Sequence, residues 1–139
     1  MRYAYPVTLE RDEAGRFVAS FPDVPEALTD GADEAEALGE ARDALRAALV
    51  GYVRARRPLP RPSRRRGTVV ALAPVVAAKL ALYQAMRSQR VSNIALAERI
   101  GVTEGAVRRL VDPDHASRME KIEAALEALG AGVVLEDAA

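Results

Sequence analysis

The sequence predicts an α+β protein in which a small antiparallel sheet and one long helix precede an all-α domain. Over residues 2–10, apolar residues alternate with other residues, which is the period of a half-buried strand. Over 33–56, the apolar residues instead recur every three or four positions, as they do on one face of a helix. The same helical spacing, interrupted by short turns, extends from 74 to 129. We therefore expect two domains, 1–72 and 73–139.

The first domain is expected to begin with a β-hairpin. Strand 2–10 is followed by turn-forming residues at 12–15, and 16–21 is its predicted partner strand. Pro22 and Pro25 end this ladder, because proline donates no backbone hydrogen bond.

A third strand, a long helix and a fourth strand complete the predicted first domain. The third strand is expected at 27–30. Asp33, with Glu36 three residues later, has the pattern of a capping box, so the helix is expected to begin here and to run to about Arg56. The β-branched residues of 68–72 predict the fourth strand. The expected apolar stripe of the helix consists of Leu38, Ala41, Leu45, Leu49 and Tyr52.

Capping residues predict the helix boundaries of the second domain. Pro74 suits the first position of a helix, where its missing N–H costs nothing. Ser92 and Thr103 are expected to cap the next two helices. The predicted apolar stripe of the first helix consists of Val75, Ala78, Leu82 and either Ala85 or Met86.

The last helix is predicted to start at a second capping box, formed by Ser117 and Glu120. Gly130 suits the position just after its end, where a positive φ is common. Residues 133–136 are expected to form a short strand or an ordered tail.

The composition is typical of a soluble cytoplasmic protein and indicates no cofactor. Because the chain has no cysteine, a disulfide framework and a Cys-based zinc site are excluded. No signal-peptide pattern is present, and no apolar stretch approaches the length that spans a bilayer. The 20 basic and 20 acidic residues balance, so the overall charge does not indicate a nucleic-acid partner.

The balanced total conceals a strong charge asymmetry. Residues 1–53 contain eleven acidic and five basic residues, whereas 54–67 contain seven arginines and no acid. An acidic region suits a basic partner, although a solvated helix surface would look the same. The arginine-rich, proline-rich segment is interpreted as an extended connector that attracts phosphate incidentally. A dedicated phosphate site and contact with the acidic region of a neighbouring chain are the alternatives.

Residues 93–112, NIALAERIGVTEGAVRRLVD, resemble the helix-turn-helix of phage-repressor-type transcription factors. Ala97 is small where two helices cross, and Gly101 occupies the turn, where a positive φ is required. Val102 fills the turn, while Val107 and Leu110 point to the core. The predicted packing face of the first helix consists of Ile94, Leu96 and Ile100. An ordinary helical hairpin in an all-α core is the alternative.

The resemblance implies a DNA contact surface on the second of these helices. In this motif, the first residues of that helix meet base edges in the major groove. Arg109 suits a bidentate contact with guanine, and Glu104 suits a contact with the amino group of cytosine. Because one module contacts half a site, we expect a homodimer or a dimer of dimers on double-stranded operator DNA with an inverted repeat. The candidate DNA-binding residues are Asn93, Thr103, Glu104, Gly105, Arg108 and Arg109.

The first domain resembles the HicB antitoxin family. The resemblance lies in the strand YAYPVTLE, followed after a turn by GRFVASFPDVPEALTDGADEAEALGEARDAL. It implies a reduced RNase-H-like fold without nuclease activity and a function in a toxin–antitoxin system. The implied partner is a HicA-like toxin, a small basic protein that cleaves RNA, which agrees with the acidic bias of 1–53.

Residues that contact the toxin are expected in the proline-stiffened loop after the second strand. The candidates are Phe21, Pro22, Asp23 and Pro25. The alternative is that this loop only shapes the connection between two strands.

Two other functional classes compete with an antitoxin. An enzyme is disfavoured, because His115 is the only histidine and no serine has a partner arranged for nucleophilic attack. A free-standing transcriptional repressor, whose first domain senses a ligand or a partner, is the stronger alternative.

Overall fold

A computed structural model describes residues 1–64 and 66–137. Arg65 of the arginine-rich segment and residues 138–139 lie outside the described residues. The chain divides into two compact units, Met1–Leu72 and Ala73–Ala139. Strands and one long helix form the first unit and helices form the second, so the predicted α+β class is confirmed.

The first unit contains two small antiparallel sheets rather than one. The first sheet has the order β2-β3-β4, with β2 at Thr8–Arg11, β3 at Phe17–Ser20 and β4 at Leu28–Gly31. The second sheet pairs β1 (Ala4–Pro6) with β5 (Val69–Ala71). The single strand expected over 2–10 is therefore divided at Val7, whose N–H donates to the Thr68 carbonyl at 3.0 Å.

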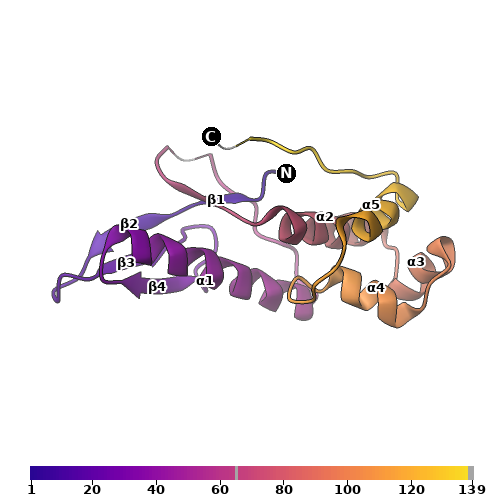
Figure 1. The fold of residues 1–139 in the computed structure, drawn as a ribbon, viewed down its shortest axis with the longest axis horizontal. Coiled ribbons are helices and arrows are strands. Elements are labelled where there is room, and N and C mark those ends of the chain that lie inside the picture. The colour runs from indigo at the N-terminus through magenta and orange to yellow at the C-terminus, as the bar shows by residue number, and fades with distance from the viewer. Residues whose placement is uncertain (65, 138–139) are drawn as a thin grey trace. The chain divides into compact units, whose positions relative to one another are not determined.

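Helix α1 (Glu34–Arg54) packs along the three-stranded sheet (Figure 1). Asp33 caps it as predicted, because its carboxylate accepts the Glu36 N–H at 2.8 Å. The close approach of the helix to β4 requires Gly31, since an added Cβ would lie 2.4 Å from the Ala37 nitrogen. Ala37 is fully buried and Leu38 only partly buried, so the stripe begins one residue earlier than expected.

The arginine-rich segment connects α1 to β5 within the first unit. Its residues pack back on that unit: Leu59 is buried, and the Tyr5 hydroxyl donates to the Pro60 carbonyl at 2.7 Å. The segment is therefore an internal connector, because the strand that completes the first unit follows it.

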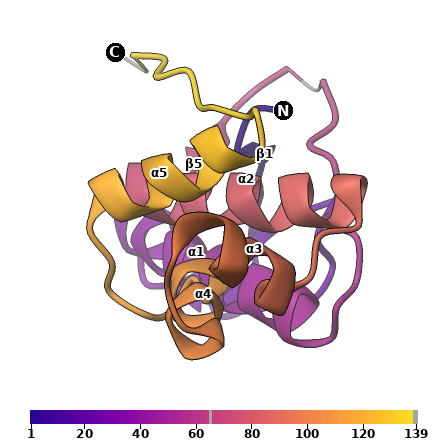
Figure 2. The same cartoon turned by 90° about the vertical axis from the view of Figure 1, so that its right-hand side faces the viewer.

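Four helices make up the second unit, and Figure 2 shows them packed together. They are α2 (Pro74–Gln89), α3 (Asn93–Ile100), α4 (Glu104–Val111) and α5 (Met119–Ala128). Pro74 opens α2 as predicted. The core side chains are fully buried and come from all four helices; they include Leu80, Leu82, Leu96, Val107, Ile122 and Leu126.

Three predictions for the second unit are wrong. Helix α5 begins at Met119 with Arg118 at its N-cap position, so Ser117 does not start a capping box. Ile94 is 62 % exposed and lies outside the packing face of α3. Residues 133–136 form no strand with any described residue, although Gly130 has the expected positive φ of 65°.

Candidate functional site

Local hydrogen bonds determine the geometry of the α3–turn–α4 segment. The Ser92 hydroxyl accepts the Ala95 N–H, and the Thr103 hydroxyl accepts the Ala106 N–H, both at 3.1 Å, so both predicted caps are confirmed. Gly101 ends α3 with a φ of 70°, which is costly for a residue with a side chain. The turn is thereby set by residues that the sequence identifies.

Helix α4 has a buried face and an exposed, positively charged face. Val107, Leu110 and Val111 are buried, whereas Arg108 and Arg109 are exposed. A Cβ added to Gly105 would lie 3.5 Å from Arg108 Nη2 and 3.5 Å from Arg109 Nη1. Two guanidinium groups therefore meet beside the first turn of α4, where the helix dipole is positive and attracts anions.

Glu104 connects the predicted residues of the two helices. Its Oε2 lies 3.2 Å from Arg108 Nη2, and its Oε1 accepts a long hydrogen bond of 3.5 Å from Asn93 Nδ2. Both carboxylate oxygens thus contact side chains of the protein itself. The structure brings Asn93, Glu104 and Arg108 together and gives Glu104 a positioning role toward Arg108.

Lys79 also belongs to this site, and sequence reasoning missed it. Its side chain is 0 % exposed, and its Nζ donates to the Arg109 carbonyl at 2.9 Å, the Asp112 carbonyl at 3.0 Å and the Ser117 hydroxyl at 2.7 Å. These bonds hold the C-terminal end of α4 against α2. Burial lowers the pKa of Lys79, and the nearby Asp112 opposes that shift. Its position four residues after Val75, on the apolar stripe of α2, was the available signal.

The proline-rich loop of the first unit has a buried and an exposed side. Phe21 and Val24 are 2 % and 0 % exposed, whereas Pro22 and Pro25 are exposed. Asp23 is partly buried, and its Oδ2 accepts both the N–H and the hydroxyl of Ser63 at 2.9 Å. Phe21 therefore shapes the loop from within, and the surface of the loop consists of Pro22, Asp23 and Pro25.

A second contact holds the other end of this loop. The Tyr52 hydroxyl donates to the Glu26 carboxylate at 2.8 Å, and the Arg57 guanidinium carbon lies 4.4 Å from the Tyr52 ring centroid. A backbone hydrogen bond of Glu26 and the Tyr52 hydroxyl lower the pKa of Glu26, while burial and the same hydrogen bond raise that of Tyr52. The loop is thus fixed by α1 at one end and by the connector at the other.

No group of three or more metal-ligating side chains occurs among the described residues. In the same part of the chain, no helix has the length and apolar character needed to cross a membrane.

Comparison with known proteins places these features in a family. Residues 4–81 match the family model described as the HicB-like antitoxin of bacterial toxin–antitoxin systems. Antitoxin HicB 2 of Photorhabdus laumondii is 40 % identical over 126 residues, which cover 91 % of this chain and 90 % of that protein.

Two further relatives agree. Antitoxin HicB of Escherichia coli is 36 % identical over 128 residues, which cover 91 % of this chain and 93 % of the relative. Antitoxin HicB of Pseudomonas fluorescens is 36 % identical over 127 residues, with coverage of 89 % and 87 %. The matches extend over both structural units, and this chain therefore belongs to the HicB-like family of antitoxins.

Proposed function

We propose that this antitoxin neutralises a HicA-like toxin through its first unit and represses its own operon by binding operator DNA through its second. The observation that supports the DNA proposal best is the meeting of the Arg108 and Arg109 guanidinium groups beside the first turn of α4. The proposal gives the protein a binding function, with no catalytic step, in the cytoplasm.

The exposed face of α4 is suited to the major groove of DNA. Thr103 and Gly105 lie at the start of the helix, where base contacts are usual in helix-turn-helix proteins. Arg109 presents a planar donor pair that matches the acceptors of guanine. Arg108, held by Glu104, is directed at a base or a phosphate, and Asn93 opens α3, whose N-terminus suits a phosphate.

The operator-bound form is proposed to be a homodimer or a dimer of dimers. A single α4 contacts half a site, and paired recognition helices about 34 Å apart fit successive major grooves. The operator would then contain an inverted repeat. Sedimentation of the protein bound to one operator measures this; one protein chain per operator would contradict it.

The first unit is proposed to cover the RNA-binding surface of the toxin. Eleven acidic against five basic residues in 1–53 suit a small basic partner and repel RNA. Pro22, Asp23 and Pro25 form a rigid part of this surface, because Ser63 and Tyr52 already order the loop. A preordered loop loses little entropy on binding.

The DNA proposal is tested by Arg109→Ala in a gel-shift titration with operator DNA. Loss of a bidentate contact should weaken specific binding by about 1–3 kcal/mol and relax selectivity at one base pair. Arg42→Ala, which removes an exposed charge from α1, is the control and should leave the affinity unchanged. Equal affinity of Arg109→Ala and the wild-type chain would overturn the assignment.

The toxin proposal is tested by co-purification with the small basic protein encoded beside this chain. The wild-type chain should bind it and inhibit its RNA cleavage. Asp23→Lys should weaken both effects, whereas Asp43→Lys on the exposed face of α1 should not. Operator binding without any toxin binding would instead support the free-standing repressor.

A further inference from the structure

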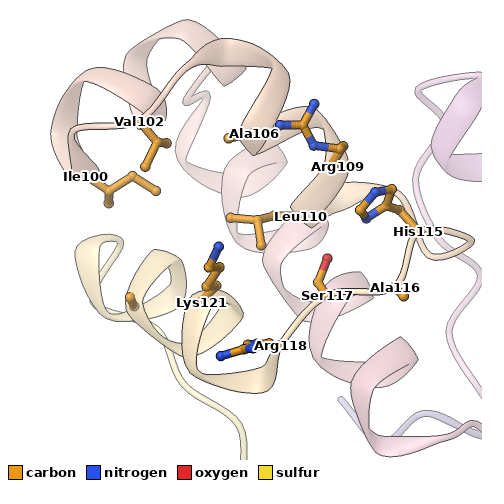
Figure 3. A pocket seen from close by; sticks show the side chains of 11 residues that line it. Ile100, Val102, Ala106, Arg109, Leu110, His115, Ala116, Ser117, Arg118 and Lys121 are labelled. Atoms are coloured by element: carbon orange, nitrogen blue, oxygen red, sulfur yellow. The ribbon is translucent and has the colours of Figure 1, made fainter.

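An apolar groove with a basic rim lies between the α3–α4 turn and α5. It has a volume of about 360 Å³, which is within the range of ligand-binding pockets. Ile100, Val102 and Leu110 line it from one side (Figure 3). Arg118 and Lys121 of α5 line it from the other, so an occupant with an apolar segment and acidic groups would fit.

The C-terminal tail of the chain has this chemistry. After Gly130 the chain leaves α5 as an extended segment in which Val134 is 96 % exposed and Leu135 is 83 % exposed. Glu136 and Asp137 follow directly. Two adjacent aliphatic side chains that face solvent indicate a surface that a partner covers, and the acidic residues complement the basic rim of the groove.

In its own chain, the tail lies on the wrong side of α5 to enter this groove. Gly132 and Val133 line a separate hollow together with Met119, Glu123 and Glu127. With about 3.6 residues per turn, these three residues lie on the face of α5 opposite Lys121 and Ala124, which line the groove. The occupant of the groove must therefore come from another molecule.

We propose that the tail of a second copy of this chain occupies the groove. Val134 and Leu135 contact the apolar floor, and Glu136 and Asp137 approach Arg118 and Lys121. Because each copy has one tail and one groove, reciprocal exchange produces a closed two-fold dimer. This inference deepens the proposed operator binding by naming the contact that pairs the two copies of α4.

Disulfide trapping tests the exchange directly, because the chain contains no native cysteine. One protein carries Leu135→Cys and a second carries Ala124→Cys, an exposed residue that lines the groove. After mixing and mild oxidation, we expect a cross-linked heterodimer. Ala35→Cys, exposed on α1, replaces Ala124→Cys in the control and should yield little product.

Three results of the trapping experiment would overturn the proposal. The first is cross-linking no greater than in the control. The second is a disulfide within one chain when both cysteines are placed in the same protein. The third is trapping of Ala124→Cys only by a toxin cysteine in the co-purified complex, which would assign the groove to the toxin.

A charge exchange tests the same contact in solution. Lys121→Glu and Glu136→Lys should each weaken self-association, measured by sedimentation equilibrium, by about tenfold at low salt, and the double variant should recover most of the loss. A purely structural effect of either substitution would not be reversed by the other. A double variant as weak as the singles would contradict the proposed pairing.

Operator binding of the wild-type chain separates this inference from the proposed function. If the tail variants remain dimeric and the wild-type chain binds its operator, the tail proposal fails and the proposed function stands. If the trapping and charge-exchange results are as expected and the wild-type chain does not bind its operator, the tail proposal stands and the proposed function fails.

Discussion

Gly105 is the residue at which stability and the proposed DNA contact are opposed. A glycine within a helix costs about 0.5–1 kcal/mol relative to alanine, because it loses more backbone freedom on folding. The absent side chain leaves the first turn of α4 open between the Arg108 and Arg109 guanidinium groups. An open turn lets the backbone approach a base closely while both guanidinium groups stay nearby.

Gly105→Ala is therefore expected to stabilise the protein and to weaken operator binding. The added methyl group would meet both guanidinium groups at ordinary van der Waals distance, 3.5 Å, so the fold tolerates it. The unfolding free energy should rise by up to about 1 kcal/mol, and operator affinity should fall several-fold. Thermal unfolding and fluorescence anisotropy with labelled operator measure the two effects.

Gly39→Ala provides a matched control for this substitution. Gly39 lies in α1, and among the described residues an added Cβ meets nothing within 4 Å. It should give the same gain in stability with unchanged operator affinity. Unchanged affinity in Gly105→Ala as well would remove Gly105 from the contact surface.

Lys79 is expected to position α4 without touching DNA. Lys79→Met leaves the Arg109 and Asp112 carbonyls without their buried donor, so the unfolding free energy should fall by about 1–3 kcal/mol. Operator affinity should fall as well, because the end of α4 is released from α2. Ser117→Ala removes only one of the three acceptors and should cause a smaller loss of both.

Denaturant unfolding and operator titration of Lys79→Met and Ser117→Ala measure these effects. Lys79→Arg keeps the charge but places a larger, planar group in the same buried space, so it should recover only part of the loss. If Lys79→Met is as stable as the wild-type chain and binds the operator equally well, Lys79 has no positioning role.

At the scale of elements, the connector after α1 orders the proposed toxin-binding loop. It returns to the first unit at Leu59 and Pro60, and it contacts the loop through Ser63 and Asp23. Tyr52 fixes the far end of the loop through Glu26. An arginine-rich segment thus acts on an acidic surface of its own unit.

The order of this loop is expected to decrease at acidic pH. The folded state lowers the pKa of Glu26, chiefly through its backbone hydrogen bond and the Tyr52 hydroxyl, so folding favours the ionised carboxylate. The resulting stabilisation is present above the ordinary carboxyl pKa of about 4.3. It is lost as the pH falls through the lower folded-state pKa. Amide hydrogen exchange of residues 21–27 between neutral and acidic pH measures it.

Tyr52→Phe is the control for the pH experiment. It removes the hydroxyl that donates to Glu26 and keeps the ring on which Arg57 stacks. The loop of this variant should exchange faster at neutral pH and change less on acidification. An identical pH response in both proteins would show that Glu26 does not order the loop through Tyr52.

At the scale of the whole molecule, a net charge of zero is divided between regions of opposite character. The acidic bias of 1–53 lies in the first unit, whereas the guanidinium groups beside α4 lie in the second. This separation suits two partners of opposite charge, a basic toxin and DNA. We therefore expect the two functions to be separable by substitution in the intact chain.

The double variant Arg108→Ala with Arg109→Ala should lose specific operator binding and retain inhibition of the toxin. Asp23→Lys should do the reverse. The salt dependence of operator binding should also become shallower in the arginine variant, by about one unit of the log–log slope for each phosphate contact removed. Loss of both functions in either variant, with the fold intact, would contradict the division of tasks.

Contacts that lie close together in the chain were predictable from the sequence. Asp33, Ser92 and Thr103 cap their helices through bonds to residues three positions away, and Gly101 has the positive φ that its turn requires. These features depend on short-range geometry, so a pattern of a few residues determines them. The residues proposed to contact DNA were accessible for the same reason.

Contacts between distant segments were not predictable in this way. Ser117 fits a capping box but accepts a hydrogen bond from Lys79, 38 positions away. The position of Lys79 on the apolar stripe gave a signal, but only packing shows which carbonyls it reaches. Phe21 lies in the same proline-rich loop as Asp23, yet one is buried and the other contacts the connector.

The amino-acid sequence by itself determined the α+β class, the helix caps, the α3–α4 turn and the membership of the antitoxin family. Local propensity, periodicity and motif order are properties of adjacent residues, and they persist in any arrangement of the units. Only the tertiary structure decided that Lys79 holds α4, that the connector orders the loop, and that the groove lies on the side of α5 opposite the tail. Each of these depends on which buried donors and apolar faces meet, and long-range packing alone brings them together.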